Sequence, residues 1–216
     1  MDRASIDLVL STTRAVRRRL DLDRPVDPAI IEECLELASF APTGGNGQAW
    51  RWIVVTEPGK RAAIASVYRR FGTDYLSAGL ASAPSGSPEH RVFSSALHLA
   101  DVLDRVPVLV IPCYEGEPGV TNAEAAGFYG SILPAAWSLL LALRSRGLGS
   151  AWTTLHLEGE QEVAELLGMP FGFTQVALFP VAHTIGAEFG PPKRRPIGEL
   201  TYWDQWGVSR RRQEPG

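Results

Sequence analysis

Hydrophobic and polar residues follow helical and strand-like spacing in turn along the chain. After Asp27 and Pro28, a typical helix start, apolar residues recur three and four positions apart as far as Ala38. The stretch 123–146 is apolar on almost every side, which predicts a buried central helix. Further helices are expected from Ser5 into the arginines near residue 18 and over 59–71, 92–103 and 161–167, and strands over 52–56, 106–113, 150–154 and 174–182. This alternation predicts a sheet covered by helices.

Two segments interrupt the pattern. Residues 41–50, APTGGNGQAW, place glycine, proline and amide side chains between a helix and a strand. Residues 75–90 are rich in Ser, Gly, Ala and Pro and are expected to form a mobile excursion. No internal repeat or long linker divides the chain, so we predict one domain over 1–216, with its core at 10–200 and a tail at 207–216.

The composition is typical of a soluble globular protein, with 45% hydrophobic and 21% charged residues in a chain of 216. The net charge of −3 supplies no overall basic field for nucleic acid, and the nearly apolar run 131–143 is too short to cross a membrane. The N-terminal residues lack an apolar signal core, which predicts a cytoplasmic protein. Cys34 and Cys113 are far apart, as expected for thiols in a reducing compartment.

Several motifs of common enzyme classes are missing from the sequence. Gly147-Leu-Gly149 follows a helix and precedes a strand, which is the reverse of the order in a dinucleotide-binding fingerprint. There is no phosphate-binding loop for nucleoside triphosphates, no zinc-protease motif, no nucleophile elbow and no cluster of carboxylates at metal-ligand spacing. The four histidines are scattered. Chemistry carried by an organic cofactor is therefore the simplest hypothesis for an enzyme of this sequence.

Positive charge is concentrated in short groups. Arg14 and Arg17 stand three residues apart, so on a helix or in its last turn their guanidinium groups share a face, and two such planar groups suit a phosphate. A solvated basic surface explains the same pair. A second group, Lys193 to Arg195, follows Gly-Pro-Pro far along the chain. It supplies further cations to the same anion if the fold brings the two groups together.

The loop 41–50 has the chemistry of a ligand-contacting segment. Pro42 ends the preceding helix, and the glycines, Gly44 among them, accept positive φ and allow a flat ligand to approach the backbone closely. Thr43 offers a hydroxyl, while Asn46 and Gln48 offer donors and acceptors to the edge of a heterocycle. An ordinary connection between helix and strand has the same turn residues, so this loop alone leaves both interpretations open.

The order of these motifs resembles the nitroreductase family of flavin enzymes. That family has an arginine motif near the N-terminus and, about 25 residues later, a segment similar to APTGGNGQAW that leads into a strand like RWIVV. The later SLLLALRSRGLGSAWTT is similar to its central helix, Gly-Leu-Gly turn and following strand, and GPPKRRPIGEL is similar to its closing basic motif. The resemblance covers residues from about 10 to 200.

The resemblance implies an α+β fold with a mainly antiparallel sheet flanked by helices, and an intertwined homodimer with tightly bound FMN at the subunit interface. Matched by motif, Arg14 and Arg17 hold the FMN phosphate from one side, and Lys193 and Arg195 hold it from the other. If the register of the first motif shifts by one, Arg18 replaces Arg17. The loop residues placed along the flavin ring and its ribityl chain, from the partner subunit, are Pro42, Thr43, Gly44, Asn46 and Gln48.

The segment after the Gly-Leu-Gly turn matches the place where a backbone N–H faces flavin N5, which assigns that role to Thr153, Thr154 or Leu155. Three positions depart from the family pattern. Thr13 replaces an arginine often found in the first motif, so the phosphate contact of that arginine is not expected here. Ala15 stands near the first phosphate contact where a serine is usual, and Ala49 replaces the proline of the loop motif. The side-chain hydroxyl contact at position 15 is therefore missing.

The implied activity is transfer of electrons from NADH or NADPH through FMN to nitroaromatic, quinone or similar small acceptors by a ping-pong mechanism, with no obligatory acid–base side chain. Acceptor choice is expected to depend on 75–90 and on Phe128 and Tyr129, although aromatic residues there are also explained by packing. The alternatives are a deazaflavin as electron donor, a specialised flavin enzyme that fragments flavin or dehalogenates its substrate, and a non-enzymatic flavin- or ligand-binding module.

Overall fold

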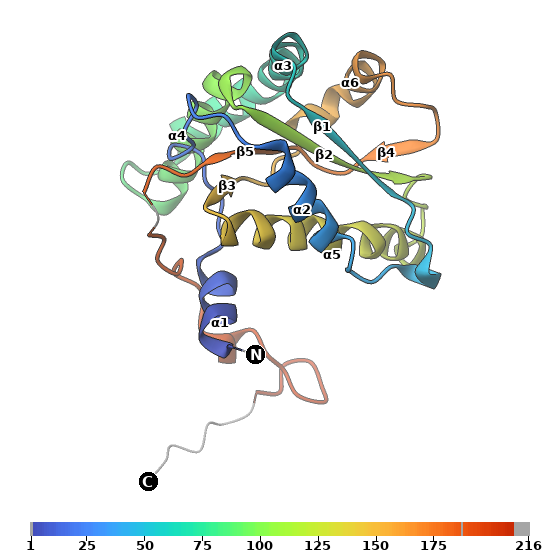
Figure 1. The fold of residues 1–216 in the computed structure, drawn as a ribbon. Coiled ribbons are helices and arrows are strands. Elements are labelled where there is room, and N and C mark those ends of the chain that lie inside the picture. The colour runs from blue at the N-terminus through green and yellow to red at the C-terminus, as the bar shows by residue number, and fades with distance from the viewer. Residues whose placement is uncertain (1, 187, 210–216) are drawn as a thin grey trace.

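The centre of the molecule is a five-stranded antiparallel sheet, shown in Figure 1. The computed structural model describes residues 2–186 and 188–209. In these residues the strands lie in the order β1, β2, β5 and β3, and β4 also pairs with β2. Their bounds are β1 Trp50–Val55, β2 Val108–Glu115, β3 Leu148–Ser150, β4 Phe173–Gln175 and β5 Phe179–His183.

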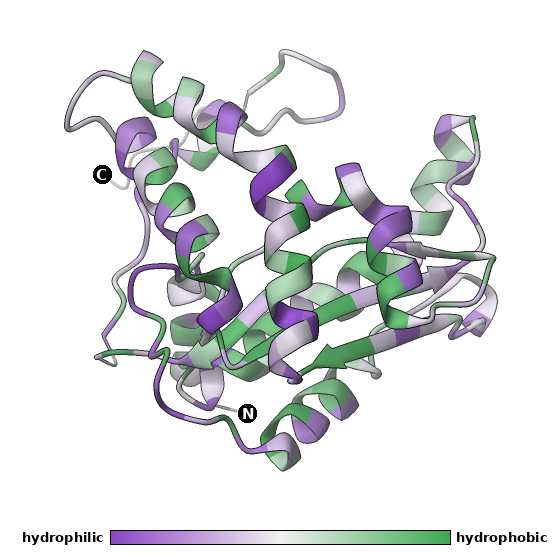
Figure 2. Ribbon diagram, turned by 90° about the horizontal axis from the view of Figure 1, so that it is seen from above, coloured by the Kyte–Doolittle hydropathy of each residue, from purple (hydrophilic) through white to green (hydrophobic). Residues whose placement is uncertain are grey.

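Helices cover both faces of this sheet (Figure 1). On one face lie α2 (Pro28–Ala38) and α5 (Asn122–Ser145). On the other lie α3 (Pro58–Ser82), α4 (Pro88–Val102) and α6 (Glu160–Leu167). The central strand β2 is apolar throughout because its alternate residues enter two cores, Val108 and Val110 toward α2 and α5, and Leu109 and Ile111 toward α3 and α4. Figure 2 shows that the strands are mostly hydrophobic, whereas the outer helices carry both hydrophobic and polar residues.

Three helices begin with the same local device, a capping side chain followed by proline. The cap accepts hydrogen bonds from backbone N–H groups of the first turn, and proline needs no partner at that position. The pairs are Asp27-Pro28 for α2, Glu57-Pro58 for α3 and Ser87-Pro88 for α4. These starts are readable in the sequence, and they explain why α2 begins at the predicted residue.

The central helix α5 begins with a capping box between Thr121 and Glu124 and runs to Ser145, within one residue of the predicted range. It is the one helix in the described chain that is long and apolar enough to cross a membrane by length and composition. Half of its most hydrophobic window is buried inside the protein, against α2 and the sheet. It is therefore the core helix that the hydrophobic pattern indicates.

Several predictions about local structure were wrong. The strand expected over 150–154 ends at Ser150, and the strand expected over 174–182 is divided into β4 and β5. Residues 75–90 are helical except for a short link, because α3 continues to Ser82 and α4 starts at Pro88. The first helix, α1, spans Arg3–Thr12 with Asp2 as its cap, and it ends before the arginines because Thr13 is extended. The prediction for Arg210–Arg212 lies outside the described residues, as does most of the tail 207–216.

Helix α1 and the segment after β5 extend away from the core (Figure 1). The segment contains a short helical turn, Ile197–Glu199, and much of its apolar surface faces outward. Ile197 is 69% exposed and Trp206 is 86% exposed. Apolar surface of this extent is unusual for a chain that remains alone in water.

Candidate cofactor site

A cavity of about 240 Å³ lies where the segment after α1 crosses the C-terminal end of α5. Its charged lining consists of Arg14, Arg144 and Arg194, and the described lining contains no carboxylate. Ser150 also lines it, and the buried Oγ of this serine has no hydrogen-bond partner among the described residues. The remaining lining residues are Thr13, Ala15, Val16, Trp137, Leu140, Leu148, Gly149 and Trp152.

The backbone of residues 13–20 is held against the edge of the sheet. The N–H of Val16 donates to the Ser150 carbonyl at 2.8 Å, and the N–H of Asp21 donates to the His183 carbonyl at 2.8 Å. Gly149 permits this close approach because it has no side chain. A Cβ at this position would lie 3.0 Å from Val16 Cβ, which is shorter than an ordinary van der Waals contact. The Gly-Leu-Gly turn thus brings the arginine segment and β3 together, a structural role that differs from dinucleotide binding.

The predicted arginine pair does not share one helical face. Arg14 is exposed at the cavity, and its Nη1 donates to the Gly190 carbonyl at 3.4 Å. Arg17 is half-buried and points toward α4, where its Nη1 donates to Ser95 Oγ at 3.3 Å. Burial lowers the pKa of Arg17. The prediction of a shared helical face was wrong because the extended backbone after α1 turns successive side chains in different directions.

Arg18 also reaches α4, where its Nη2 donates to the carbonyl and the Oγ of Ser94 at 3.1 and 2.8 Å. Arg19 holds the C-terminal segment through the Ile185 and Glu188 carbonyls. The four arginines of this stretch therefore have separate local contacts. Among them, Arg14 lines the cavity.

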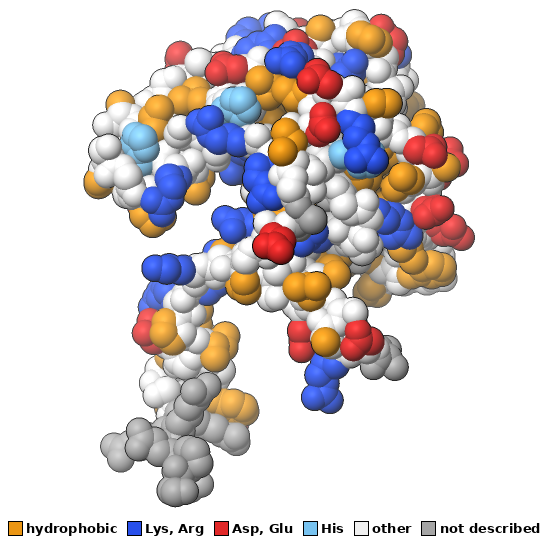
Figure 3. Space-filling view, turned by 60° about the vertical axis from the view of Figure 1, so that its left-hand side comes forward, with side chains coloured by type: hydrophobic (Ala, Val, Ile, Leu, Met, Phe, Trp, Pro, Cys, Tyr) orange, Lys and Arg blue, Asp and Glu red, His pale blue; other side chains and the backbone are white. Residues whose placement is uncertain are grey.

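The second basic group contributes a different residue from the two expected. Arg194 lines the cavity, whereas Arg195 is exposed and faces Glu199 at 3.5 Å, and Lys193 is exposed. Arg144, from the last turn of α5, is a further cation that sequence reasoning missed. Figure 3 shows Lys and Arg side chains gathered around the hollow between the extended segment and the core.

The backbone of Thr153 is already paired within the chain. Its N–H donates to the Leu178 carbonyl at 3.2 Å, and its carbonyl accepts from the Leu178 N–H at 2.8 Å. Thr154, which is exposed, and Leu155 follow at the start of the turn Leu155–Gly159. Of the three residues assigned to flavin N5, Thr154 and Leu155 therefore keep a donor that is not committed to the Leu178 bridge.

Two buried polar residues, Tyr68 and His156, lie at this segment. The Tyr68 hydroxyl lies 2.8 Å from Thr153 Oγ1, and burial raises the pKa of Tyr68 above its ordinary value. His156 is fully buried, and its burial lowers its pKa to about 4. The cysteines are free and buried, and burial raises the pKa of Cys113 to about 12, so this thiol is inert near neutral pH.

The glycine-rich loop has positive φ at one of its three glycines, Gly45, and also at two residues that are not glycine. Positive φ occurs at Gly45 (58°), Asn46 (55°) and Gln48 (48°), while Gly44 and Gly47 are part of an ordinary short turn. Gln48 Nε2 donates to Asn46 Oδ1 at 3.0 Å, and the Gly44 N–H donates to Ser131 Oγ at 3.1 Å. Pro42 and residues 44–48 are exposed, and Thr43 is half-buried.

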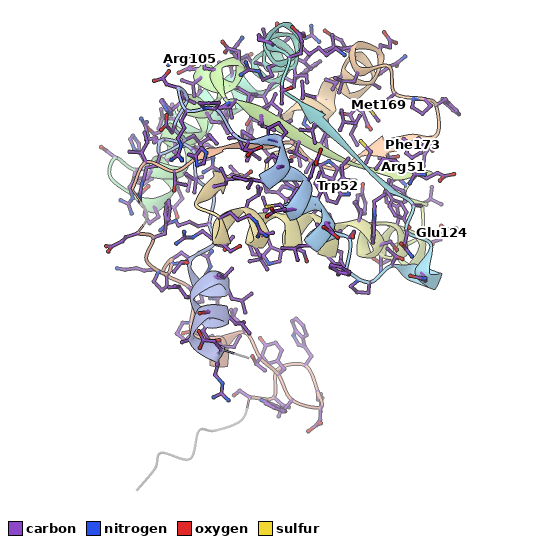
Figure 4. All side chains as sticks on the ribbon, in the orientation of Figure 1. Arg51, Trp52, Arg105, Glu124, Met169 and Phe173 are labelled. Atoms are coloured by element: carbon purple, nitrogen blue, oxygen red, sulfur yellow. The ribbon has the colours of Figure 1, made fainter. Side chains whose placement is uncertain are left out.

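Within one chain, the loop and the cavity are far apart. The loop is anchored at Ser131 on α5, whereas Arg144 at the cavity is thirteen residues further along the same helix (144 − 131 = 13), or about 20 Å at 1.5 Å per residue. In Figure 4 the loop lies beside Glu124, at the end of α5 opposite to the end that joins β3. The structure therefore brings Arg14, Ala15 and Arg194 together but leaves the loop residues at a second place.

Another cavity lies at the far edge of the sheet, between β1, β2 and α6. The side chains of Arg51 and Phe173 approach each other there (Figure 4), with Arg51 Cζ 5.7 Å from the centre of the Phe173 ring.

Among the described residues no group of three or more His, Cys, Asp or Glu side chains is arranged to hold a metal ion.

Comparison with known proteins places this arrangement in a family. The family model for nitroreductases matches residues 10–183, and the chain belongs to the nitroreductase family. The sequence is 28% identical over 221 residues to a 5,6-dimethylbenzimidazole synthase of Rhodospirillum rubrum, covering 99% of this chain and 93% of that protein. It is 28% identical over 219 residues to an NADH dehydrogenase of Thermus thermophilus, covering 93% and 98%.

The same fold occurs in solved structures. A structure of iodotyrosine deiodinase bound to FMN and 3-iodo-L-tyrosine matches with a TM-score of 0.67 at 20% identity, covering 92% of this chain and 100% of that chain. The predicted fold, α+β with a mainly antiparallel sheet, is thus confirmed, and FMN is bound in a protein of this fold. Membership of the family indicates an oxidoreductase.

Proposed function

We propose that this protein is a cytoplasmic FMN-dependent oxidoreductase that passes electrons from NADH or NADPH to a small organic acceptor such as a nitroaromatic or a quinone. The observation that carries the proposal is the cavity at Arg14, which joins two of the family's motif segments in a basic site without a described carboxylate. Its three arginines and the unpartnered Ser150 Oγ fit the charge and the oxygen atoms of a phosphate.

Arg14 and Arg194 hold the phosphate in this proposal, with Arg144 behind them and Ser150 as a neutral partner. Lys193 and Arg195 stay in the proposal as exposed cations that add to the local field. Arg17 and Arg18 are assigned to the side of the site that faces α4, where the structure directs them. The small Ala15 leaves room beside Arg14, in the place of a hydroxyl contact.

We propose that a second copy of the chain completes the site. The cavity of about 240 Å³ is smaller than the 300 to 1,000 Å³ typical of cofactor and drug-sized sites, so it encloses part of FMN. The loop with Pro42, Thr43, Gly44, Asn46 and Gln48 belongs over the flavin of the partner in this homodimer. The apolar surface for such a dimer includes Ile6, Leu8 and Leu10 of α1, Leu37 of α2 and Trp137 of α5.

FMN, when bound, supplies the chemistry of accepting a hydride and returning two electrons. The chain binds and orients it, and Thr154 or Leu155 offers a backbone N–H to the ring. The cations around the cavity stabilise negative charge on the cofactor. This function requires no acid–base side chain, so the proposed site is a cofactor-binding site.

The test is the absorption spectrum of the purified protein. It should carry FMN or take it up on reconstitution, lose the flavin absorbance when NADH or NADPH is added without oxygen, and recover it on addition of a nitroaromatic or quinone. Titration with each nucleotide separates the two donors, and a reduced deazaflavin is the parallel trial. A colourless chain that takes up no FMN contradicts the proposal and favours a non-enzymatic module.

A specialised flavin enzyme is the second candidate function. It is supported by the match to a 5,6-dimethylbenzimidazole synthase over 99% of this chain and by the fold shared with iodotyrosine deiodinase. Incubation of the reduced, FMN-loaded protein in air, followed by mass spectrometry, tests for 5,6-dimethylbenzimidazole as a flavin fragment. Release of iodide from 3-iodo-L-tyrosine tests for dehalogenation. Turnover in either assay that exceeds nitroaromatic reduction favours this candidate.

A further inference from the structure

Helix α3 holds the segment that follows the Gly-Leu-Gly turn by a direct side-chain bond, and the two residues are 85 positions apart in sequence. We propose that Tyr68 is a positioning residue for the flavin-facing backbone at Thr154 and Leu155, and that it acts through the Thr153 hydroxyl. This inference rests on the proposed function, because it assigns Tyr68 a task at the same cofactor site.

Two residues about one helical turn apart on α3, Tyr68 and Gly72, contact the two residues that flank Thr154 in the sequence. Tyr68 reaches Thr153, and its hydroxyl lies 2.8 Å from Oγ1. Gly72, four residues later on the same helical face, lies against Leu155, and a Cβ there would be 2.8 Å from Leu155 Cδ1. One face of α3 therefore fixes both neighbours of Thr154, while Thr154 itself remains exposed.

The bond to Tyr68 fixes the side chain of Thr153, which the backbone hydrogen bonds of this residue leave free to rotate. The bridge to Leu178 fixes the N–H and carbonyl of Thr153, and the hydroxyl bond fixes its side chain. Tyr68 is 2% exposed, and its ring packs among the apolar residues between the sheet and α3. A buried phenol in a packed core has one well-defined orientation, which is the property a positioning residue needs.

The phenol also stays neutral. Burial raises the pKa of Tyr68, against the smaller lowering effects of the Thr153 bond and of the Arg17 charge. The charge of Arg17 therefore acts on Tyr68, although the side chain of Arg17 bonds to Ser95 on α4.

The experiment compares Tyr68→Phe with Tyr114→Phe in the FMN-loaded protein. Tyr114 is the last residue but one of β2 and packs against Phe128, so its variant removes a tyrosine hydroxyl outside the contact with Thr153. Three quantities are measured: the midpoint potential of bound FMN, hydrogen exchange of the backbone over 151–157, and the melting temperature. Loss of one neutral hydrogen bond corresponds to roughly a threefold to tenfold change in an equilibrium.

We expect Tyr68→Phe to shift the FMN midpoint potential and to speed exchange over 151–157 roughly threefold to tenfold, while Tyr114→Phe leaves both unchanged. Thr153→Val should reproduce the effect without adding to that of Tyr68→Phe, and Thr153→Ser should retain the wild-type values. A fall in melting temperature with unchanged potential and exchange overturns the positioning role. Failure of the wild-type chain to bind FMN contradicts the proposed function instead, so the two failures are distinct.

Discussion

The two regions expected to contact the flavin, residues 13–20 with β3 and the loop 42–48, are held by the chain in different ways. The first is paired with the sheet through Val16 and Asp21, and its side chains are fixed by α4 and by the C-terminal segment. The loop is mostly exposed, and its amides at Asn46 and Gln48 bond to each other. The first region is organised by its own chain, whereas the loop presents its polar groups outward.

In the proposed homodimer, this difference corresponds to two roles, one region binding the phosphate and the other covering the flavin of the partner. A site for a charged group needs fixed cations, because unpaired charge and mobile side chains weaken binding. The loop needs a second surface, because its glycine and amide groups have no partner element over most of their length in the described chain. The two regions that the proposal assigns to FMN lie about 20 Å apart along α5.

Acid should destabilise the folded protein through His156, which is fully buried in the turn Leu155–Gly159. Its folded pKa of about 4 lies below the ordinary value of 6.5, so the unfolded state binds a proton between those pH values that the folded state does not. The contribution of neutral His156 to the free energy of unfolding should therefore be fully present above pH 6.5. The free energy of unfolding should fall by about 3 kcal/mol as the pH drops to 4. Chemical denaturation at a series of pH values measures this loss.

The matched variant for this pH effect is His156→Met, which removes the titrating group and keeps an apolar core. It should show a flatter pH dependence between 6.5 and 4 than the wild type. An identical slope in His156→Met and wild type means that another group is responsible.

Removal of two of the three cations of the cavity should give the next largest effect. Arg14→Ala with Arg194→Ala deletes two charge-assisted bonds to the proposed phosphate, and FMN binding should weaken about 100-fold or more. Fluorescence titration with FMN measures the change. The control is Arg70→Ala with Arg146→Ala, which removes two arginines that pair with Glu162 and Glu33 elsewhere. Equal FMN affinity in the cavity variant and the wild type contradicts the phosphate assignment.

Mixed dimers test whether the two regions act across subunits. One chain carries the cavity variant, and the other carries Thr43→Val with Asn46→Ala in the loop. If the loop completes the partner's site, the mixed dimer contains one intact site and retains FMN, whereas each variant alone loses it. If both regions served the same chain, every site in the mixed dimer would be damaged. Two affinity tags isolate the mixed species, and its FMN content gives the answer.

The smallest predicted effect concerns the loop backbone. Gly45 has φ 58°, so Gly45→Ala should lower the free energy of unfolding by about 1 kcal/mol. Gly127 lies exposed within α5 with no atom near an added Cβ, so Gly127→Ala should raise it by about 1 kcal/mol. Thermal denaturation compares the two variants. If both variants change the free energy of unfolding in the same direction, the loop adopts another conformation in solution.

The sequence predicted elements whose signals are local and failed where contacts between elements decide. The range 75–90 looked irregular because of its Gly, Ser and Pro content. In the structure Gly79 lies against the Phe93 ring and lets α3 and α4 pack closely, while Ser87 caps α4 by accepting from the His90 N–H at 3.0 Å. The same residue types that mark a flexible segment are here the close-packing and capping residues of a helical hairpin.

Arg194 and Ser150 show the same limit at the site. Sequence motifs identified the two basic segments, but which side chain enters the cavity depends on the path of extended backbone, and Lys193 and Arg195 were named in place of Arg194. Ser150 is significant because its hydroxyl is buried without a partner among the described residues, which is a property of packing. Tyr68 and Thr153 are likewise joined across 85 positions.

The sequence by itself determined the start of α2, the buried central helix, the motif order of the nitroreductase family and the two basic segments, because each depends on neighbouring residues or on spacing along the chain. The tertiary structure decided that Arg14 and Arg17 separate, that Arg194 joins Arg14, and that the loop lies at the opposite end of α5. These outcomes depend on how the sheet and helices pack, and side chains distant in sequence meet only when the core has formed.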